Sequence, residues 1–383
     1  MKARSLRTVA LAAAALATVS LAATAQVVTL PPDGKNQKAS VSQWIGLVEV
    51  DVTYNSPKVT APDGSDRTGK IWGQLVPYGM ANLGFGTCGD QCPWRAGANE
   101  NTVFRVSRGV KIEGQPLPAG SYGLHMIPGR EEWTVIFSKN STSWGSFFYN
   151  PAEDALRVTV KPRKCEYNHW LTYEFTERQP DRATVALKWE YLEVPWTITV
   201  DDATELYVEN LRRQLRDAPG FNWQGWQQAA NFCLTNKTNL KEALGWAQNA
   251  VTLPYIGEEN FNTLRTLADL QAANGMNAEA EKTWRQAIDH PTATVMDLHQ
   301  YGRQLQARGE NEKALVVFEL NAKKHPNAWP VNVGLARGYA AVGRTAEALK
   351  YAKLAVGQAP DEANRKNLEK MVQEMETAAK TKT

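Results

Sequence analysis

Residues 309–326 read GENEKALVVFELNAKKHP, and the order of small and large residues in this stretch recurs in the last third of the chain. Three sets of positions repeat every 34 residues. They are Gly275, Gly309 and Gly343; Ala280, Ala314 and Ala348; and Trp284, Phe318 and Ala352. A fixed period of this length predicts stacked helix pairs, in which each unit buries its apolar face against its neighbours.

The period and the small-large-small spacing in the second helix of each unit resemble the tetratricopeptide repeat. In that repeat the glycine turns the chain between helix A and helix B, and the alanine lets the two helices approach closely. We expect such repeats over residues 221–377. A looser first unit carries Ala243, Ala247 and Ala250, a capping helix covers residues 361–377, and a tail covers residues 378–383.

The resemblance implies that helix A of each unit lines a concave groove for a protein or an extended peptide. The positions carried over are Asn262, Arg265, Asp269, His299, Arg303, Gln306, Val333 and Arg337. The three arginines could receive carboxylates of a peptide. Alternatively, Asp269 neutralises one of them and the others are solvated, because an exposed ion pair contributes only about 0–1 kcal/mol. The sequence leaves this choice of ligand charge open.

The N-terminal half alternates apolar and polar residues with a period of two. Val48, Val50, Val52 and Tyr54 point one way, and the residues between them point the other. The same alternation recurs over residues 133–137, 156–160, 171–175, 185–191 and 196–200. About eight to ten short strands with one polar face predict an antiparallel β-sandwich of jelly-roll type over residues 46–200. The predicted fold class is multidomain β + α, with residues 201–220 as a connecting helix.

Three blocks in this half resemble a family of exported bacterial proteins known as domain of unknown function 2911. The blocks are Lys70–Gly79, Trp94–Thr102 and Leu117–Gly129. The resemblance spans about residues 46–200 and implies no established activity. In the family pattern Pro-Tyr-Gly runs almost directly into Trp-Arg, whereas here Met80–Pro93 are interposed. This insertion predicts a lid over the Trp-Arg block, or an obstruction of it.

The blocks contain a candidate polar site made of Arg95, Asn99, Glu100 and His125. The planar fork of Arg95 suits a carboxylate, and an imidazole beside a carboxylate can transfer protons near neutral pH. A structural role is the alternative, in which Gly97 and Asn99 shape a turn, Arg95 pairs with Glu100, and His125 is an interior residue. The sequence shows no activated Ser or Cys and no phosphate loop beside them, and it predicts no cofactor and no metal.

Two readings of function follow. The favoured one is a binding or scaffold protein without catalytic residues, whose helical repeats recruit a protein or peptide. The alternative is an envelope enzyme of hydrolase type, in which Arg95 orients a substrate and Glu100 or His125 handles a proton.

The chain has four cysteines. Cys88 and Cys92 flank Gly-Asp-Gln in a Gly-rich loop, where a short disulfide is sterically possible. A metal or redox pair would instead need a partner His or a C-x-x-C spacing. Cys165 and Cys233 are expected in different domains, where each is equally consistent with a buried thiol and with a bridge.

The first 25 residues have the features of a secretory signal. Lys2, Arg4 and Arg7 precede an apolar run that closes on Ala23-Thr24-Ala25. We expect cleavage after Ala25, a linker over residues 26–45, and a periplasmic or secreted protein with no membrane span after signal removal. Cleavage removes three of 43 basic residues and leaves 40 against 40 acidic ones. A neutral chain lacks the basic bias that nucleic acid or an anionic membrane requires.

Overall fold

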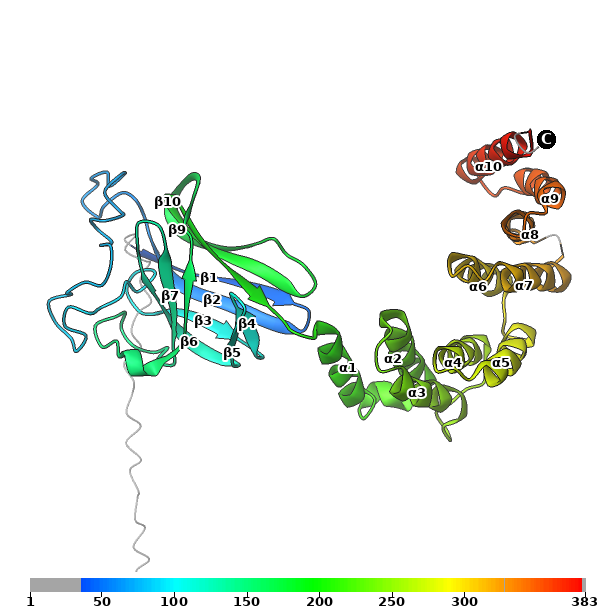
Figure 1. Cartoon of the computed structure of the whole chain (residues 1–383), viewed down its shortest axis with the longest axis horizontal. Coiled ribbons are helices and arrows are strands. Elements are labelled where there is room, and N and C mark those ends of the chain that lie inside the picture. Colours follow the sequence, from blue (N-terminus) through cyan, green and yellow to red (C-terminus); the bar gives the residue numbers. More distant parts are fainter. Residues whose placement is uncertain (1–35, 327, 381–383) are drawn as a thin grey trace, which may run out of the picture. The chain divides into compact units, whose positions relative to one another are not determined.

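The computed structural model describes residues 36–326 and 328–380. The predicted signal and residues 26–35 of the predicted linker lie outside the described residues. The chain divides between Thr199 and Val200 into two compact units. The first contains the strands and the second contains all but one of the described helices (Figure 1).

The first unit consists of two antiparallel sheets, which confirms the predicted β-sandwich. One sheet has six strands in the order β1-β2-β3-β6-β7-β8, and the other has four in the order β5-β4-β10-β9. The strands of the first sheet are β1 (Asn36–Ile45), β2 (Val48–Pro57), β3 (Thr102–Val106), β6 (Gly120–Ile127), β7 (Trp133–Ser138) and β8 (Asp154–Val160). Those of the second are β4 (Val110–Ile112), β5 (Gln115–Leu117), β9 (Arg163–Thr176) and β10 (Arg182–Thr199), and a short 3-10 helix covers Pro151–Glu153.

The sheets meet through the apolar faces that the alternation predicts. Val48, Val50 and Val52 of β2 are fully buried. The ring of Tyr54 lies edge-on to the ring of Tyr173 on β9, with centroids 4.8 Å apart. The Tyr173 hydroxyl lies at the end of the buried ring and donates a hydrogen bond to the Ala96 carbonyl at 2.7 Å. The core thereby holds the loop that follows Trp94.

Two elements differ from the expectation. Residues 36–45, which the sequence assigns to the linker, form β1 and pair with β2 along their whole length. Burial alternates along this edge strand from Lys38 to Ile45, but polar Gln43 lies on the inner side and Trp44 on the exposed side, which blurs the apolar pattern in the sequence. Residues 182–199 form the single strand β10 instead of two strands. Glu190 has a φ of +56° between two register shifts, so the strand bends through an irregularity and does not end.

The second unit is built of antiparallel helix pairs. Its helices are α1 (Ala203–Gln214), α2 (Trp223–Asn236), α3 (Leu240–Thr252), α4 (Phe261–Ala273), α5 (Asn277–Asp289), α6 (Val295–Ala307), α7 (Asn311–Lys324), α8 (Val331–Ala341), α9 (Thr345–Gly357) and α10 (Glu362–Lys380), with a 3-10 helix at Ala218–Phe221. Gly275, Gly309 and Gly343 have φ angles of 79–80° between α4 and α5, α6 and α7, and α8 and α9. The predicted turn positions are confirmed.

Small residues let the helices of neighbouring units interlock. The ring of Phe318 on α7 is 1% exposed, and a Cβ added to Gly334 on α8 would lie 2.6 Å from it. Ala314 and Ala348 are fully buried where the helices of a pair approach. The tetratricopeptide architecture therefore follows from the contacts that the period predicts. None of the described helices is both long enough and apolar enough to cross a bilayer.

Candidate functional site

The loop of residues 93–101 enters β3 and carries three of the four predicted polar residues. Two hydroxyls hold it, because those of Thr102 and Tyr173 both donate to the Ala96 carbonyl, at 3.0 and 2.7 Å. Ala96 and Asn99 have positive φ angles of 51° and 56°, which only a tightly held turn imposes on residues with a side chain. Position 97 requires glycine for a different reason: the loop backbone packs so closely against Thr102 that a Cβ there would lie 2.6 Å from Thr102 Oγ1.

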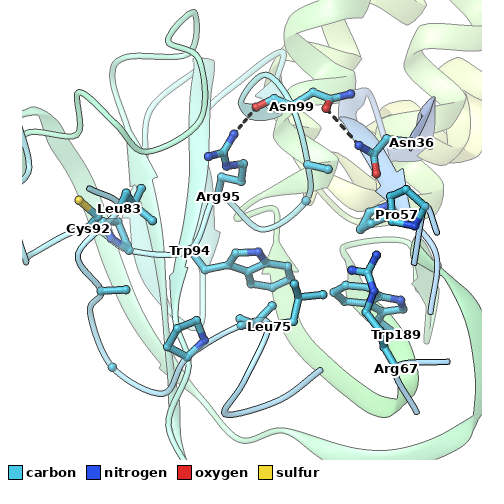
Figure 2. A pocket seen from close by; sticks show the side chains of 18 residues that line it. Asn36, Pro57, Arg67, Leu75, Leu83, Cys92, Trp94, Arg95, Asn99 and Trp189 are labelled. Carbon is cyan, nitrogen blue, oxygen red and sulfur yellow. Dashed lines mark hydrogen bonds between the residues drawn. The ribbon is translucent and has the colours of Figure 1, made fainter. Parts of the chain in front are cut away.

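Arg95 is fixed by contacts with neutral groups. Its Nη1 donates to the Asn99 carbonyl at 2.7 Å, and its guanidinium lies 4.8 Å from the ring centroid of Phe147. A Cβ on Gly145 would lie 2.5 Å from the guanidinium carbon, so only glycine leaves room for it. In the described ranges no carboxylate pairs with Arg95, and burial lowers the pKa of its guanidinium. Asn99 Oδ1 in turn accepts from Asn36 Nδ2 at 3.1 Å (Figure 2).

Arg95 and Asn99 line a pocket of about 400 Å³, which we call the sandwich pocket. It also receives Arg67, Leu75 and Trp94 from loops and Trp189 from β10 (Figure 2). The insertion of Met80–Pro93 forms part of its wall through Ala81, Leu83, Cys92 and Pro93. The insertion thus borders an open pocket beside the Trp-Arg block.

An aromatic cluster makes the wall of the sandwich pocket rigid. The rings of Trp94 and Trp189 lie nearly parallel at 6.4 Å, and Trp72 stands edge-on to them at 5.8 and 5.7 Å. Trp133 closes the cluster against Trp72 at 5.2 Å. Four indoles in mutual contact resist rearrangement, because each ring is confined by the others.

His125 and Glu100 are engaged away from this pocket. His125 on β6 is 2% exposed, its Nδ1 lies 2.8 Å from Ser146 Oγ, and its ring meets the edge of Tyr149. Burial, with a smaller contribution from the positive charge of Arg95, lowers the pKa of His125 to about 4, so the ring is neutral at pH 7. The Glu100 carboxylate accepts from Asn55 Nδ2 at 2.6 Å. The structure therefore gathers two of the four predicted residues and uses the other two in internal contacts.

Sequence reasoning missed Ser146, Arg67, Asn36 and Trp189. The Ser146 and His125 pair has the spacing of a nucleophile and its base, but Ser146 is 0% exposed, so a substrate cannot reach it in this conformation. Arg67 lies 28 residues before Arg95, and Trp189 lies on a strand of the opposite sheet. No spacing rule connects these positions.

Cys88 and Cys92 form a disulfide, with Cα atoms 5.2 Å apart, inside the insertion. Cys165 and Cys233 are not bridged, and burial raises the pKa of the Cys233 thiol to about 11. In the part of the chain that the structure describes, no three His, Cys, Asp or Glu side chains gather in a way that could hold a metal ion.

The predicted groove residues lie on the A helices α4, α6 and α8. Asn262, Arg303 and Arg337 are exposed, Arg265, Asp269 and Gln306 are half-buried, and His299 and Val333 are buried. Two hollows lie on this side of the array. One of about 700 Å³ includes Arg265 and Asp269, and one of about 510 Å³ includes His299, Arg303, Val333 and Arg337.

The predicted groove residues pair in a way that the sequence did not anticipate: Asp269 does not neutralise Arg265, Arg303 or Arg337. Asp269 binds Arg308 at 2.9 Å, a residue absent from the predicted set, and Arg265 donates to the neutral Gln304 at 2.9 Å. Arg303 and Arg337 form no ion pair within the described residues. Although the residue as a whole is exposed, partial desolvation of its guanidinium, and secondarily the charge of Arg303, lowers the pKa of Arg337. Burial, with smaller contributions from both arginines, lowers the pKa of His299 to about 4.

Comparison with known protein families finds a match in the first unit. Residues 36–198 match the family described as Protein of unknown function (DUF2911), which confirms the resemblance seen in the three blocks. No curated protein matches the chain.

Several solved structures are similar to the helical region. YrrB, described as a TPR protein with an unusual peptide-binding site, is 19% identical over 43% of this chain and 83% of its own, with a TM-score of 0.28. TTC0263, a thermophilic TPR protein in Thermus thermophilus, is 18% identical over 45% of this chain and 89% of its own, with a TM-score of 0.30. A tetratricopeptide repeat protein from Parabacteroides merdae is 16% identical over 45% of this chain and 68% of its own, with a TM-score of 0.30.

Proposed function

We propose that this protein, whose residues 36–198 form a domain of the family of unknown function 2911, is an exported scaffold protein. Its tetratricopeptide array recruits a protein or an extended peptide, and its β-sandwich has an uncharacterised role. One observation carries the proposal: Arg303 and Arg337 are exposed in a hollow of the concave side and have no ion-pair partner among the described residues.

The hollow around these arginines has the composition of a peptide site. Its apolar lining includes the partly exposed Trp329 and the buried Val333 and Leu368. Lys370 and Glu374 also line it but lie 3.9 Å from each other, so their charges largely cancel. The two arginines therefore leave the hollow with excess positive charge beside apolar surface, which favours a segment that carries carboxylates next to apolar side chains.

Export is supported by two features. The first 25 residues have the order of basic, apolar and small residues typical of a secretory signal. The Cys88–Cys92 disulfide is of a kind that persists in oxidising compartments and is rare in the cytosol. Both features favour a periplasmic or secreted protein.

The enzyme alternative receives less support from the geometry. General acid–base catalysis requires the acid or base to lie within hydrogen-bond reach of a bound substrate. The two candidates, Glu100 and His125, do not line the sandwich pocket, and both already have partners. The same pocket retains Arg95, which can bind a ligand without reacting with it.

The test is a crosslinked pulldown from envelope extracts with the full-length mature chain, read by mass spectrometry. We expect Arg303→Glu/Arg337→Glu to lose the partner. Arg285→Glu is the matched control, because Arg285 on α5 is exposed, pairs with Glu281 and does not line either of these hollows. Arg95→Ala/His125→Ala should also keep the partner.

Circular dichroism must first show that the charge-reversed array is as helical as the natural one. Capture of the same partner by Arg303→Glu/Arg337→Glu would contradict the proposal. Its loss in Arg285→Glu as well would show that any charge reversal on the array is sufficient, which would also count against the concave hollow.

A further inference from the structure

We propose that the sandwich pocket binds a small organic carboxylate with an apolar or aromatic body. This site is separate from the concave hollows of the array, because every residue that lines it belongs to residues 36–189. The inference therefore stands whether or not the array recruits a partner.

The charge of the lining selects an anion. Arg67 and Arg95 are the two charged residues among those lining the sandwich pocket, and the lining includes no Asp or Glu. In the described ranges neither arginine has an ion-pair partner. Of the five N–H groups of Arg95, one has an acceptor, the Asn99 carbonyl. Asp63, which does not line the pocket, interacts with Arg67 through its charge without forming an ion pair. The lining itself therefore holds two guanidinium groups and no acidic group, and a bound carboxylate would stabilise them.

The position of Arg95 is set before any ligand arrives. Its guanidinium lies between the Phe147 ring and Gly145, and the Asn99 carbonyl fixes the direction of one N–H. Asn99 is itself held by Asn36. A group that is already oriented loses little conformational entropy on binding, so its hydrogen bonds contribute more to affinity.

The rest of the lining requires an apolar body on the ligand. Trp94 presents its partly exposed ring, the buried Trp189 stacks behind it, and Leu75 and Leu83 add aliphatic surface (Figure 2). Leu75 is about half exposed, so apolar surface near the pocket remains uncovered in the unbound protein. An inorganic anion would satisfy the arginines and leave this surface in contact with water. A carboxylate on a ring or an alkyl chain satisfies both.

The size of the cavity limits the ligand. About 400 Å³ lies at the lower end of the range of roughly 300–1,000 Å³ typical of small-molecule sites. The disulfide-bonded insertion bounds one side through Cys92 and Pro93, so the cavity cannot lengthen into a channel there without moving the insertion. This favours a compact acid over a long polymer.

The experiment compares three probes on the full-length mature protein by calorimetry and tryptophan fluorescence. They are phenylacetate, its neutral isostere phenylacetamide, and inorganic phosphate. We expect saturable binding of phenylacetate that changes the emission of the tryptophan cluster. Phenylacetamide should bind at least about tenfold more weakly, because it has the apolar body without the charge, and phosphate should produce no comparable fluorescence change.

Variants locate the site. Arg67→Gln should weaken phenylacetate binding roughly tenfold to a hundredfold, the usual effect of losing a charged hydrogen bond. Arg95→Gln should do the same, but it also removes the contact with Phe147 and needs a folding control. Arg105→Gln is the matched control, since Arg105 pairs with Glu49 outside the pocket. It should leave affinity unchanged.

Three results would overturn the inference. They are equal affinity for phenylacetate and phenylacetamide, unchanged affinity in Arg67→Gln, and no binding of phenylacetate up to about 1 mM, the weak end of specific recognition. Because Arg67 is only half-buried and has no described ion-pair partner, Arg67→Gln is expected to fold and keeps the test decisive if Arg95→Gln does not.

Discussion

The sandwich pocket and the hollow beside α6, α8 and α10 both contain arginines that have no ion-pair partner among the described residues, but the two regions hold them differently. Arg95 is confined by a ring, a glycine and a carbonyl, and it borders a cavity walled by tryptophans. Arg303 and Arg337 are exposed on α6 and α8 above a partly apolar hollow. A fixed cation suits a small ligand of defined shape, whereas exposed cations along a groove suit a polypeptide that adjusts to them.

The difference arises from how each fold makes its surface. In the sandwich the site is assembled from loops and from a strand of the opposite sheet, so distant residues fix one another. In the array each helix pair contributes equivalent positions, so the groove is a series of similar surfaces. Each region can therefore be disturbed without the other, and four substitution or pH experiments test that separation.

The largest effect is expected from removing one large buried side chain from each unit in turn. Trp189→Ala should lower the unfolding free energy of the sandwich by about 3–5 kcal/mol, and Phe318→Ala should do the same to the array. Both side chains are 1% exposed. Denaturation followed by near-ultraviolet dichroism for the sandwich and by the helical signal for the array separates the two transitions. A shift of both transitions by either variant would show that the regions are coupled.

A pH titration compares the two buried histidines. The pKa of His125 and that of His299 are each about 4 in the folded protein, against about 6.5 when unfolded. Between these values the unfolded chain binds protons that the folded one excludes, so each region loses stability as the pH falls from about 6.5 to about 4. The loss is on the order of 3 kcal/mol per histidine. A resonance assigned to His125 or His299 that titrates near 6.5 in the folded protein would contradict this.

Removing the disulfide should act on the sandwich alone. Cys88→Ser/Cys92→Ser is expected to lower the unfolding free energy of the sandwich by about 2 kcal/mol, the chain-entropy effect of a very short loop. The transition of the array should not change, because both substituted cysteines lie in the first unit. Since Cys92 lines the sandwich pocket, binding of phenylacetate should weaken in the same variant. Undiminished affinity would mean that the wall holds its shape without the disulfide.

The smallest effect concerns helix propensity in the array. Nothing lies within 4 Å of a Cβ placed on Gly245 of α3, so Gly245→Ala should raise the unfolding free energy of the array by up to about 1 kcal/mol. Gly334→Ala is the contrast, because its Cβ would meet the Phe318 ring and lower stability. Thermal melts of both variants measure the sign. Stabilisation by both variants would show that the Phe318 ring can move away from the added methyl group at little cost in free energy.

The features that the sequence predicted correctly are those that repeat with a fixed period. The 34-residue spacing located the turns at Gly275, Gly309 and Gly343, and the alternation located β2, β7 and β8. It failed for β1, since Gln43 on the inner side and Trp44 on the exposed side blur the alternation of an edge strand. It also failed for β10, since the irregularity at Glu190 resembles an end of the strand.

The site was only half predictable for a related reason. Arg95 and Asn99 share a short loop, and the local pattern was sufficient to group them. Their true neighbours, Arg67 and Trp189, reach the pocket through loop packing and through contact between the sheets. His125 was grouped by its chemistry, but burial decided its environment. Tertiary contacts of this kind leave no spacing in a single sequence.

Asn36 on β1 both lines the sandwich pocket and donates to Asn99, so the edge strand of the six-stranded sheet takes part in the pocket wall. A reporter dye attached at position 36 would therefore lie at this wall, where occupancy of the cavity changes its surroundings.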